Sequence, residues 1–222
     1  MFHVKQFLLF LFLAISVQSY TQGNILLENH VFQLQQARDK LIDDLLSFDS
    51  VFNEHKSFEK EFFYWTNVMR KNPKEFSNVI IIPFLAQFPS ANSISSLSLL
   101  EDLSKLDTLP ALLPDEHLNN IANTHSYDLS QNQKRLSHHS SNGKDFAARM
   151  REAGISTCAG ENLLMGQQTP LVSLILLLVD HNVPGYGHRK ALLNPLYNRM
   201  GCSNTQVAHS TQSILVQLFS CK

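Results

Sequence analysis

Apolar residues recur at helical intervals soon after the N-terminus. Across residues 24–48 they alternate with glutamines and basic residues, which predicts an amphipathic helix. Its apolar face consists of Leu27, Val31, Leu34, Leu41 and Leu45. We expect this helix to pack on the domain; a propeptide and a partner-binding helix are the alternatives.

A second helix is predicted over residues 57–69, and Asn72-Pro73 marks its end. Its buried face consists of Phe58, Phe62, Trp65 and Met69. Residues 84–98 are rich in proline, serine and asparagine, which is typical of a surface loop. We expect a short helix to follow over residues 99–106.

The acidic residues Asp115 and Glu116 follow Pro114 and open a further helix, because negative charge in the first turn complements the helix dipole. Its inner face consists of Leu118, Ile121, Ala122, His125 and Leu129. His125 therefore points inward. We interpret it as a core histidine held by a neighbour's hydrogen bond, and a secondary role in a pocket is the alternative.

The last third of the chain ends in strand patterns. Residues 146–153 form a short predicted helix, which Gly154 ends in the usual C-terminal position. Residues 171–179 are almost wholly apolar, so we expect a central helix that is buried on nearly every side. Strands are predicted near residues 200–203 and over residues 214–219. Because helices outnumber strands and the strands come late, the pattern favours an α+β fold.

The N-terminus has the pattern of an export signal. His3 and Lys5 precede an apolar core over residues 7–15, which is too short to span a bilayer as a helix. Val17 and Ser19 supply the small side chains that a signal peptidase accepts, so we expect cleavage after Ser19. A short membrane anchor or a buried helix is the alternative. Since no later segment approaches spanning length, we expect a secreted, extracellular protein that is not an integral membrane protein.

Composition narrows the class of protein. The chain has 222 residues, of which 44% are hydrophobic and 17% charged, and this suits one globular domain with appendages. A net charge of -1 gives no overall field to attract nucleic acid. Three cysteines fit an oxidising compartment. Because Cys202 and Cys221 bracket the predicted terminal strands, we predict a bridge between them, with Cys158 free or paired between chains.

Two histidines and two acids stand out as candidate chemistry. His138, Glu161, Asp180 and His188 are separated by 23, 19 and 8 residues, spacings that suit groups brought together by a fold. Neutral imidazoles with carboxylates match what Zn²⁺ accepts, and an open fourth position would bind water. The same four groups can instead hydrogen-bond to one another without a metal.

A metal-dependent hydrolase is the sharper hypothesis. A bound metal lowers the pKa of its water toward about 7, and Glu161 would take the proton as general base. The sequence contains no His-Glu-x-x-His, Gly-x-Ser-x-Gly or Gly-x-x-x-x-Gly-Lys motif. The best local signatures of zinc peptidases, serine hydrolases and phosphate-binding loops are therefore missing.

Taken in order, the motifs of the last third resemble the CAP superfamily of cysteine-rich secretory proteins, insect venom allergens and plant pathogenesis-related proteins. The motifs are Leu-Ser-His-His-Ser-Ser-Asn-Gly at 136–143, Arg149, Ala153-Gly154, Ala-Gly-Glu-Asn at 159–162, and Gly-His-Arg-Lys-Ala-Leu-Leu-Asn-Pro at 187–195. The match is closest to the cysteine-poor branch, where Val-Asp-His-Asn-Val-Pro at 179–184 stands in for an Asp-Asp-Gly-Val-Pro type segment. It covers roughly residues 61–219.

This resemblance implies a three-layer α-β-α sandwich whose central cleft holds two histidines and two acids. His138 matches the first cleft histidine, and Gly143 five residues on favours it over His139. Glu161 matches the Glu of Gly-Glu-Asn, and His188 matches the second histidine. The remaining matches are Asp180, where many relatives have a Glu nearby, and His209, where this branch often has another histidine.

Two departures from the family pattern concern the cleft. Residues 171–179 lack the tryptophan that relatives commonly carry there, and His181 replaces an Asp that is typical of this branch. Both departures bear on the depth and acidity of the cleft and leave the expected fold unchanged.

The sequence thus predicts a signal peptide over residues 1–19, an N-terminal helical segment over 20–55 and a CAP domain over 56–222. We expect a secreted, non-enzymatic binding module whose cleft takes a divalent metal, with Zn²⁺ as the candidate, through His138 and His188. Its expected partners are an extracellular protein, a lipid or sterol, or a glycan. The alternatives are a peptidase-like hydrolase that uses Glu161, and a buried polar network that serves stability alone.

Overall fold

The computed structural model describes residues 18–20, 27, 31–32, 34, 36–155, 158–166 and 168–221. The predicted export signal lies outside these residues except at its end. There, strand β1 (Gln18–Tyr20) spans the cleavage site expected after Ser19.

A five-stranded sheet, in the order β1-β3-β5-β4-β2, forms the centre of the described fold. Strands β3 (Ala159–Gly166) and β4 (Arg199–Gln206) flank β5 (Ser213–Ser220), and both pair with it antiparallel. The short strands β1 and β2 (Leu113–Pro114) add parallel edges. The strands predicted near 200–203 and over 214–219 are confirmed, whereas β3 was not predicted.

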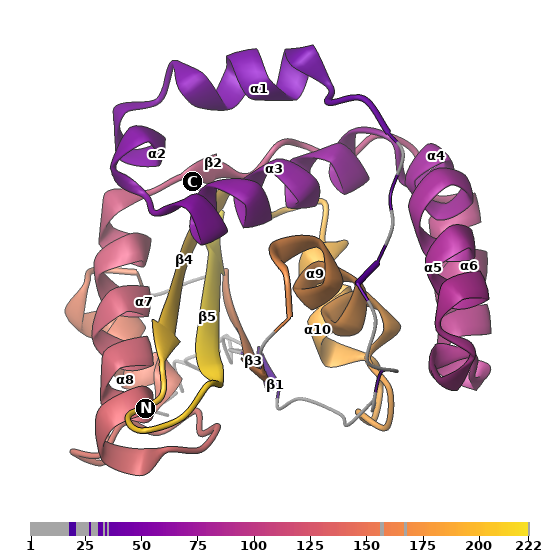
Figure 1. Cartoon of the computed structure of the whole chain (residues 1–222). Coiled ribbons are helices and arrows are strands. Elements are labelled where there is room, and N and C mark those ends of the chain that lie inside the picture. Colours follow the sequence, from indigo (N-terminus) through magenta and orange to yellow (C-terminus); the bar gives the residue numbers. More distant parts are fainter. Residues whose placement is uncertain are drawn as a thin grey trace, which may run out of the picture.

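Helices cover both faces of this sheet (Figure 1). One layer contains α7 (Glu116–Asp128), followed by the π-helical turn η3 (Leu129–Gln133), and α8 (Phe146–Glu152). The other layer contains α3 (Ser57–Lys71), α9 (Pro170–Val179) and α10 (Gly187–Leu192). The predicted α+β class and three-layer α-β-α sandwich are therefore confirmed.

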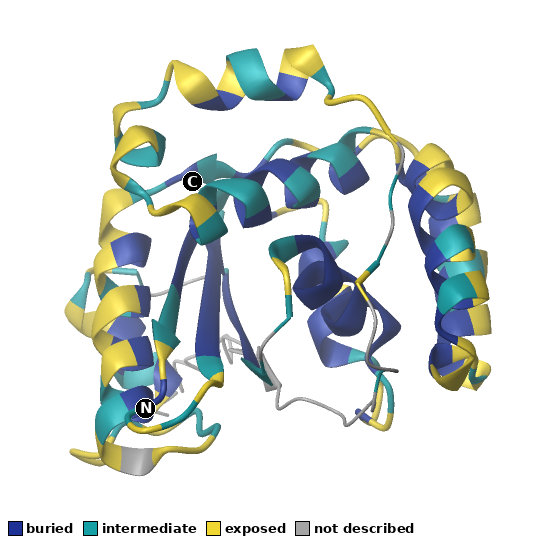
Figure 2. Cartoon of the chain, in the orientation of Figure 1, coloured by how far each residue is buried: buried dark blue, intermediate teal, exposed yellow. Residues whose placement is uncertain are grey.

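The side chains of β5 point alternately to the two faces of the sheet, which separates two hydrophobic cores. Ile214, Val216 and Leu218 are buried against α7 and α8. Leu215 and Phe219 point to the opposite face and join the larger cluster around α3 and α9. Figure 2 shows the resulting buried surfaces on both sides of the strands.

Helix α9 forms as its sequence predicts. Every residue from Leu171 to Val179 is buried, which agrees with an almost wholly apolar helix at the centre of a layer. Across the described residues, none of the helices combines the length and apolar character needed to cross a bilayer.

The helix predicted over residues 24–48 is wrong for the described residues that precede Lys40. Within its described part, the helix α1 is limited to Lys40–Ser47, where the Asp39 side chain caps the N–H groups of Leu41 and Ile42. Leu41 and Leu45, expected on the inner face, are exposed, and Ile42 and Leu46 are buried instead. Upstream, the centroid of the Phe32 ring lies 5.3 Å from that of the Phe84 ring, so tertiary packing holds Phe32 in place.

Helix α2 (Ser50–Glu54) follows α1, and α1 lies alongside α3 (Figure 1). Helix α3 confirms the second predicted helix and extends it to Lys71. Phe62 and Met69 are fully buried as expected, whereas Phe58 and Trp65 are only partly buried. The domain boundary expected at residue 56 falls between α2 and α3.

The surface loop predicted over residues 84–98 is also wrong. The chain from Pro73 to Lys105 is mostly helical, as α4 (Pro73–Phe76), η1 (Ser77–Ile81), α5 (Ile82–Gln87), η2 (Pro89–Ala91) and α6 (Ile94–Lys105). Pro83 lies in the first turn of α5, where a missing N–H costs little. Ser93 and Ser96 form a capping box at the start of α6, so these serines mark a helix boundary.

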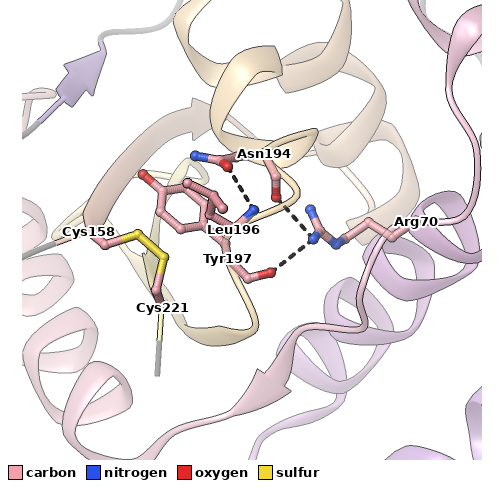
Figure 3. Close-up of a disulfide and its surroundings, with 6 residues drawn as sticks. All are labelled: Arg70, Cys158, Asn194, Leu196, Tyr197 and Cys221. Atoms are coloured by element: carbon pink, nitrogen blue, oxygen red, sulfur yellow. Dashed lines mark hydrogen bonds between the residues drawn. A yellow bond between two sulfur atoms is a disulfide. The ribbon is translucent and has the colours of Figure 1, made fainter.

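The disulfide joins Cys158 to Cys221, so the predicted bridge between Cys202 and Cys221 is wrong (Figure 3). Strand register explains the pairing. Ala159 lies opposite Ser220 in the β3–β5 ladder, which places the flanking cysteines side by side, and the Cys221 N–H donates to the Cys158 carbonyl at 3.1 Å. Cys202 lies opposite Gln217 and is a free, buried thiol whose pKa is raised by burial.

A buried arginine ties α3 to the segment after α10. The Arg70 side chain donates to four backbone carbonyls, those of Pro110, Leu192, Asn194 and Tyr197, at 2.7 to 3.1 Å. Figure 3 shows the contacts with Asn194 and Tyr197. Burial lowers the pKa of Arg70 to about 10, which leaves the side chain charged at neutral pH. Arg70 therefore fixes the segment that follows His188.

Replacing Cys158 and Cys221 together by alanine should lower the free energy of unfolding by about 2–4 kcal/mol, because the bridge closes a loop of 63 residues in the unfolded chain. Denaturant titration measures this change, and Cys202→Ala is the matched control that keeps the bridge. Peptide mapping of the non-reduced protein should recover Cys158 linked to Cys221. A peptide pair that contains Cys202 would contradict the assignment.

Candidate functional site

Glu161 is the centre of a buried polar cluster, the Glu161 cluster, formed with His125, His138, Ser140 and Arg149. Its side chain is 0% exposed and points from β3 toward the layer of α7 and α8. Its Oε1 is 2.7 Å from Nδ1 of His138, and its Oε2 is 2.5 Å from Nη2 of Arg149. Both carboxylate oxygens are therefore engaged.

Opposing effects act on the charge of Glu161. Burial alone would raise the pKa of the Glu161 carboxyl. The hydrogen bond with His138 and the positive charge of Arg149 outweigh burial, so the pKa lies below its ordinary value. Glu161 is consequently ionised at neutral pH.

Arg149 connects this carboxylate to the loop that carries His138. Its Nη1 donates to the carbonyls of His138 and Lys144 and to Oγ of Ser140, at 3.0 to 3.2 Å. Gly143, with φ at +84°, allows the turn that brings the Ser140 N–H to the Lys144 carbonyl at 2.8 Å. The Asn-Gly turn thus gives the loop the shape that Arg149 requires.

His125 supports the same loop from α7. Its Nε2 lies 3.0 Å from the Ser137 carbonyl and its Nδ1 lies 3.1 Å from Oγ of Ser140. Because a carbonyl only accepts, Nε2 carries the hydrogen and Nδ1 accepts from the serine hydroxyl. Burial lowers the pKa of His125 to about 4, so the ring is neutral. These contacts agree with its interpretation as a core histidine held by neighbours.

His138 leaves one possible acceptor of the cluster without a partner among the described residues. Because ionised Glu161 only accepts, Nδ1 of His138 carries a hydrogen, and in the neutral ring Nε2 is left with a free lone pair. Within the described residues this Nε2 is buried and has no hydrogen-bond partner. The side chain as a whole is 12% exposed, whereas the neighbouring His139 is exposed. His138 therefore presents an unsatisfied acceptor near the surface.

Asp180 and His188 form a second pair. Nδ1 of His188 lies 2.6 Å from Oδ1 of Asp180, and the other carboxylate oxygen accepts from the backbone N–H groups of His188 and Arg189 at 2.9 and 3.3 Å. Asp180 ends α9 in the left-handed conformation, with φ at +55°. The carboxylate therefore orients His188 and satisfies the first turn of α10.

The two pairs approach β3 from opposite layers. Glu161 and Asn162 are successive residues of a strand, so their side chains point to opposite faces. Nδ2 of Asn162 donates to the His188 carbonyl at 3.3 Å and to Oε1 of Gln217 at 3.1 Å, on the face away from α7. The structure brings His138 to Glu161 and His188 to Asp180, and β3 lies between the pairs.

Zinc sites need three or four donors that converge on one point. His138 meets part of this demand, because the Glu161 carboxylate at Nδ1 leaves Nε2 as the ligating atom. Among the described residues, however, no group of three or more His, Cys, Asp or Glu is arranged to hold a metal. Within the described part of the chain, the two pairs therefore do not form such a donor set.

His209 takes no part in either pair. It lies exposed in the turn between β4 and β5, with φ at +60°. Arg149, which the sequence analysis named among the family motifs but not as a site residue, is part of the site. It shares the inner face of α8 with Phe146 and Met150, and a charged residue at i+3 on an apolar face is the signal that was available.

A family model described as the cysteine-rich secretory protein family, or CAP, matches residues 63–221, well over half of the chain. The chain belongs to the CAP family. The resemblance inferred from the ordered motifs is thereby confirmed. None of the curated protein sequences compared with the chain matches it.

Solved CAP structures are similar to parts of the chain. An extracellular protein with an SCP domain from Bacillus anthracis is 26% identical, with a TM-score of 0.39 over 51% of this chain and 35% of that one. An outer surface protein from Borrelia burgdorferi is 21% identical, with a TM-score of 0.44 over 56% of this chain and 85% of that one. The CAP domain of enterococcal PrgA is 13% identical, with a TM-score of 0.42 over 83% of this chain and 70% of that one. The chain spans about a third of the Bacillus protein.

Arg149→Met should lower the free energy of unfolding by about 3 kcal/mol or more, because it leaves the buried Glu161 carboxylate without its charged partner. Arg151→Met, an exposed position on the same helix, should change it by less than about 0.5 kcal/mol. Urea titration of both variants makes the comparison. Equal effects would contradict a specific role of Arg149.

Acid should destabilise the domain through His125. Its pKa is lowered in the folded state, so the unfolded chain binds a proton that the folded domain does not, and stability falls as the pH drops from 6.5 toward 4. His125→Gln, whose amide can still donate to Ser137, should reduce this slope by up to about 1.4 kcal/mol per pH unit. His117→Gln, exposed on the same helix, is the control. Parallel pH profiles for wild type and His125→Gln would refute the assignment.

Proposed function

We propose that this chain is an exported, extracellular CAP-domain protein that binds a ligand at the Glu161 cluster and has no hydrolytic activity of its own. The observation that carries the proposal is the buried Nε2 of His138, which has no hydrogen-bond partner among the described residues. Both oxygens of Glu161 and both ring nitrogens of His125 are occupied by neighbours. Nε2 of His138 is therefore the acceptor of the described cluster that is left for a ligand.

The chemistry of that acceptor limits the ligand. A neutral imidazole nitrogen accepts a hydrogen bond, so the ligand must present a hydroxyl or amide hydrogen. Extracellular proteins, sterols or other lipids with a hydroxyl group, and glycans all meet this requirement. Leaving a buried acceptor unsatisfied costs about 1–3 kcal/mol, so a ligand that donates to Nε2 would recover this free energy.

The geometry is unfavourable for Glu161 as a general base. A base needs an accessible oxygen and a pKa near the working pH. Glu161 is fully buried, both of its oxygens are engaged, and its pKa is lowered. These features support a binding module over the peptidase-like alternative.

Zinc is the alternative occupant of the site. A zinc ion bound by His138 and His188 would require the two pairs to meet, although β3 lies between them in the described arrangement. Calorimetric zinc titration of the exported protein distinguishes the two occupants. We expect no stoichiometric zinc binding that depends on His138 and His188. Stoichiometric binding that is lost in both His138→Ala and His188→Ala would establish the metal site in place of the free acceptor.

Turnover of a peptide library, with and without added zinc, tests the absence of hydrolysis. We expect wild type to release no product above the rate of His138→Ala. His139→Ala, an exposed neighbour, is the matched control, and circular dichroism checks that each variant folds. Turnover by wild type that Glu161→Gln abolishes would overturn the proposal and establish the enzyme.

A further inference from the structure

A separate cavity opens at the end of the sheet, on the face opposite the Glu161 cluster. Its volume is about 400 Å³, within the range of small-molecule sites. Two adjacent rows of the ladder form its floor. One row consists of Leu164, Leu215 and Asn204, and the next row on the same face consists of Gly166, Ser213 and Gln206. Regular strand pairing therefore fixes the positions of the floor residues.

Two helices wall this sheet-end cavity. Phe58 lines it from the start of α3, and its ring stacks on that of Phe62 at a centroid distance of 6.4 Å. Ser173 lines it from the first turns of α9. The Gln168 side chain lies against Gly166, at a place that a Cβ atom would fill. The cavity thus combines an aromatic wall with the side-chain amide of Gln168, whose position requires that Gly166 has no side chain.

Ser173 is the observation that points to a ligand. The residue is 2% exposed and lines the cavity, yet its hydroxyl makes no hydrogen bond with any described residue. A buried serine on a helix usually bonds to the carbonyl one turn earlier. The Ser173 hydroxyl is therefore available to a partner from within the cavity.

The lining determines the charge of that partner. Among the described residues that line the cavity, the polar ones are uncharged amides and alcohols, namely Gln168, Ser173, Asn204, Gln206, Thr211 and Ser213. A charged ligand would lose water without gaining an opposite charge from this lining. The Asn204 N–H donates to Oε1 of the buried Glu59 at 3.0 Å, so a carboxylate beside this row also disfavours an anion.

We propose that the sheet-end cavity binds a neutral sugar. Amides and alcohols both donate and accept, as the hydroxyl groups of a sugar do, and the Phe58 ring offers an apolar surface for the sugar's C–H face. Ser173 donates to or accepts from one of these hydroxyl groups. The site is independent of the Glu161 cluster and of the function proposed for it.

Saturation-transfer NMR of the full chain tests the proposal, with a panel of neutral mono- and oligosaccharides of glucose, galactose, mannose and N-acetylglucosamine and with sialylated and sulfated galactosides for comparison. We expect saturable binding of at least one neutral sugar, weakened about fivefold by Ser173→Val and by Phe58→Ala. Ser104→Val, an exposed serine of α6, and His138→Ala should leave it unchanged. Circular dichroism confirms that each variant folds.

Three results would overturn the proposal. They are an absence of saturable binding by every sugar of the panel, binding that Ser173→Val and Phe58→Ala both leave unchanged, and preferential binding of sialylated or sulfated sugars. Loss of sugar binding in His138→Ala alone would assign the sugar to the Glu161 cluster instead. That outcome would reject the sheet-end cavity and leave the proposed function in place.

Discussion

The ion pair between Glu161 and Arg149 is the interaction on which the site depends. An ionised carboxylate that is 0% exposed is strongly unfavourable unless a charge and hydrogen bonds compensate it. Arg149 supplies the charge and also holds the loop of His138 through two carbonyls and a hydroxyl. Glu161 in turn fixes the tautomer of His138, so the free acceptor at Nε2 follows from this pair.

The strand period divides the polar residues between two layers. Glu161 and Asn162 point to opposite faces of β3, so the Gly-Glu-Asn motif serves both His138 and the backbone of His188. The same alternation builds the floor of the sheet-end cavity from Leu164, Leu215 and Asn204. One sheet thus positions two chemically different sites, one around a buried charge and the other uncharged.

Much of this arrangement could be predicted from local sequence. The apolar run of α9, the acidic start of α7 and the ordered motifs each specify their element or family within a few residues. The errors arose where distant contacts decide the outcome. Phe32 packs on Phe84, and the described residues between Val31 and Asp39 are not helical despite their apolar pattern. Strand β3 was missed, and without its register with β5 the pairing of Cys158 with Cys221 was not predictable.

Nitrogen-15 NMR of the histidine rings at neutral pH tests the central claim most directly, because it reports which ring nitrogen carries the hydrogen. The account predicts that His138 is protonated at Nδ1 with a bare Nε2, and that His125 is protonated at Nε2. Glu161→Gln should remove the preference of the His138 hydrogen for Nδ1. It should leave the preference of the His125 hydrogen for Nε2 unchanged. Protonation of His138 at Nε2 in the wild-type protein would contradict the account, since no free acceptor would then exist at the site.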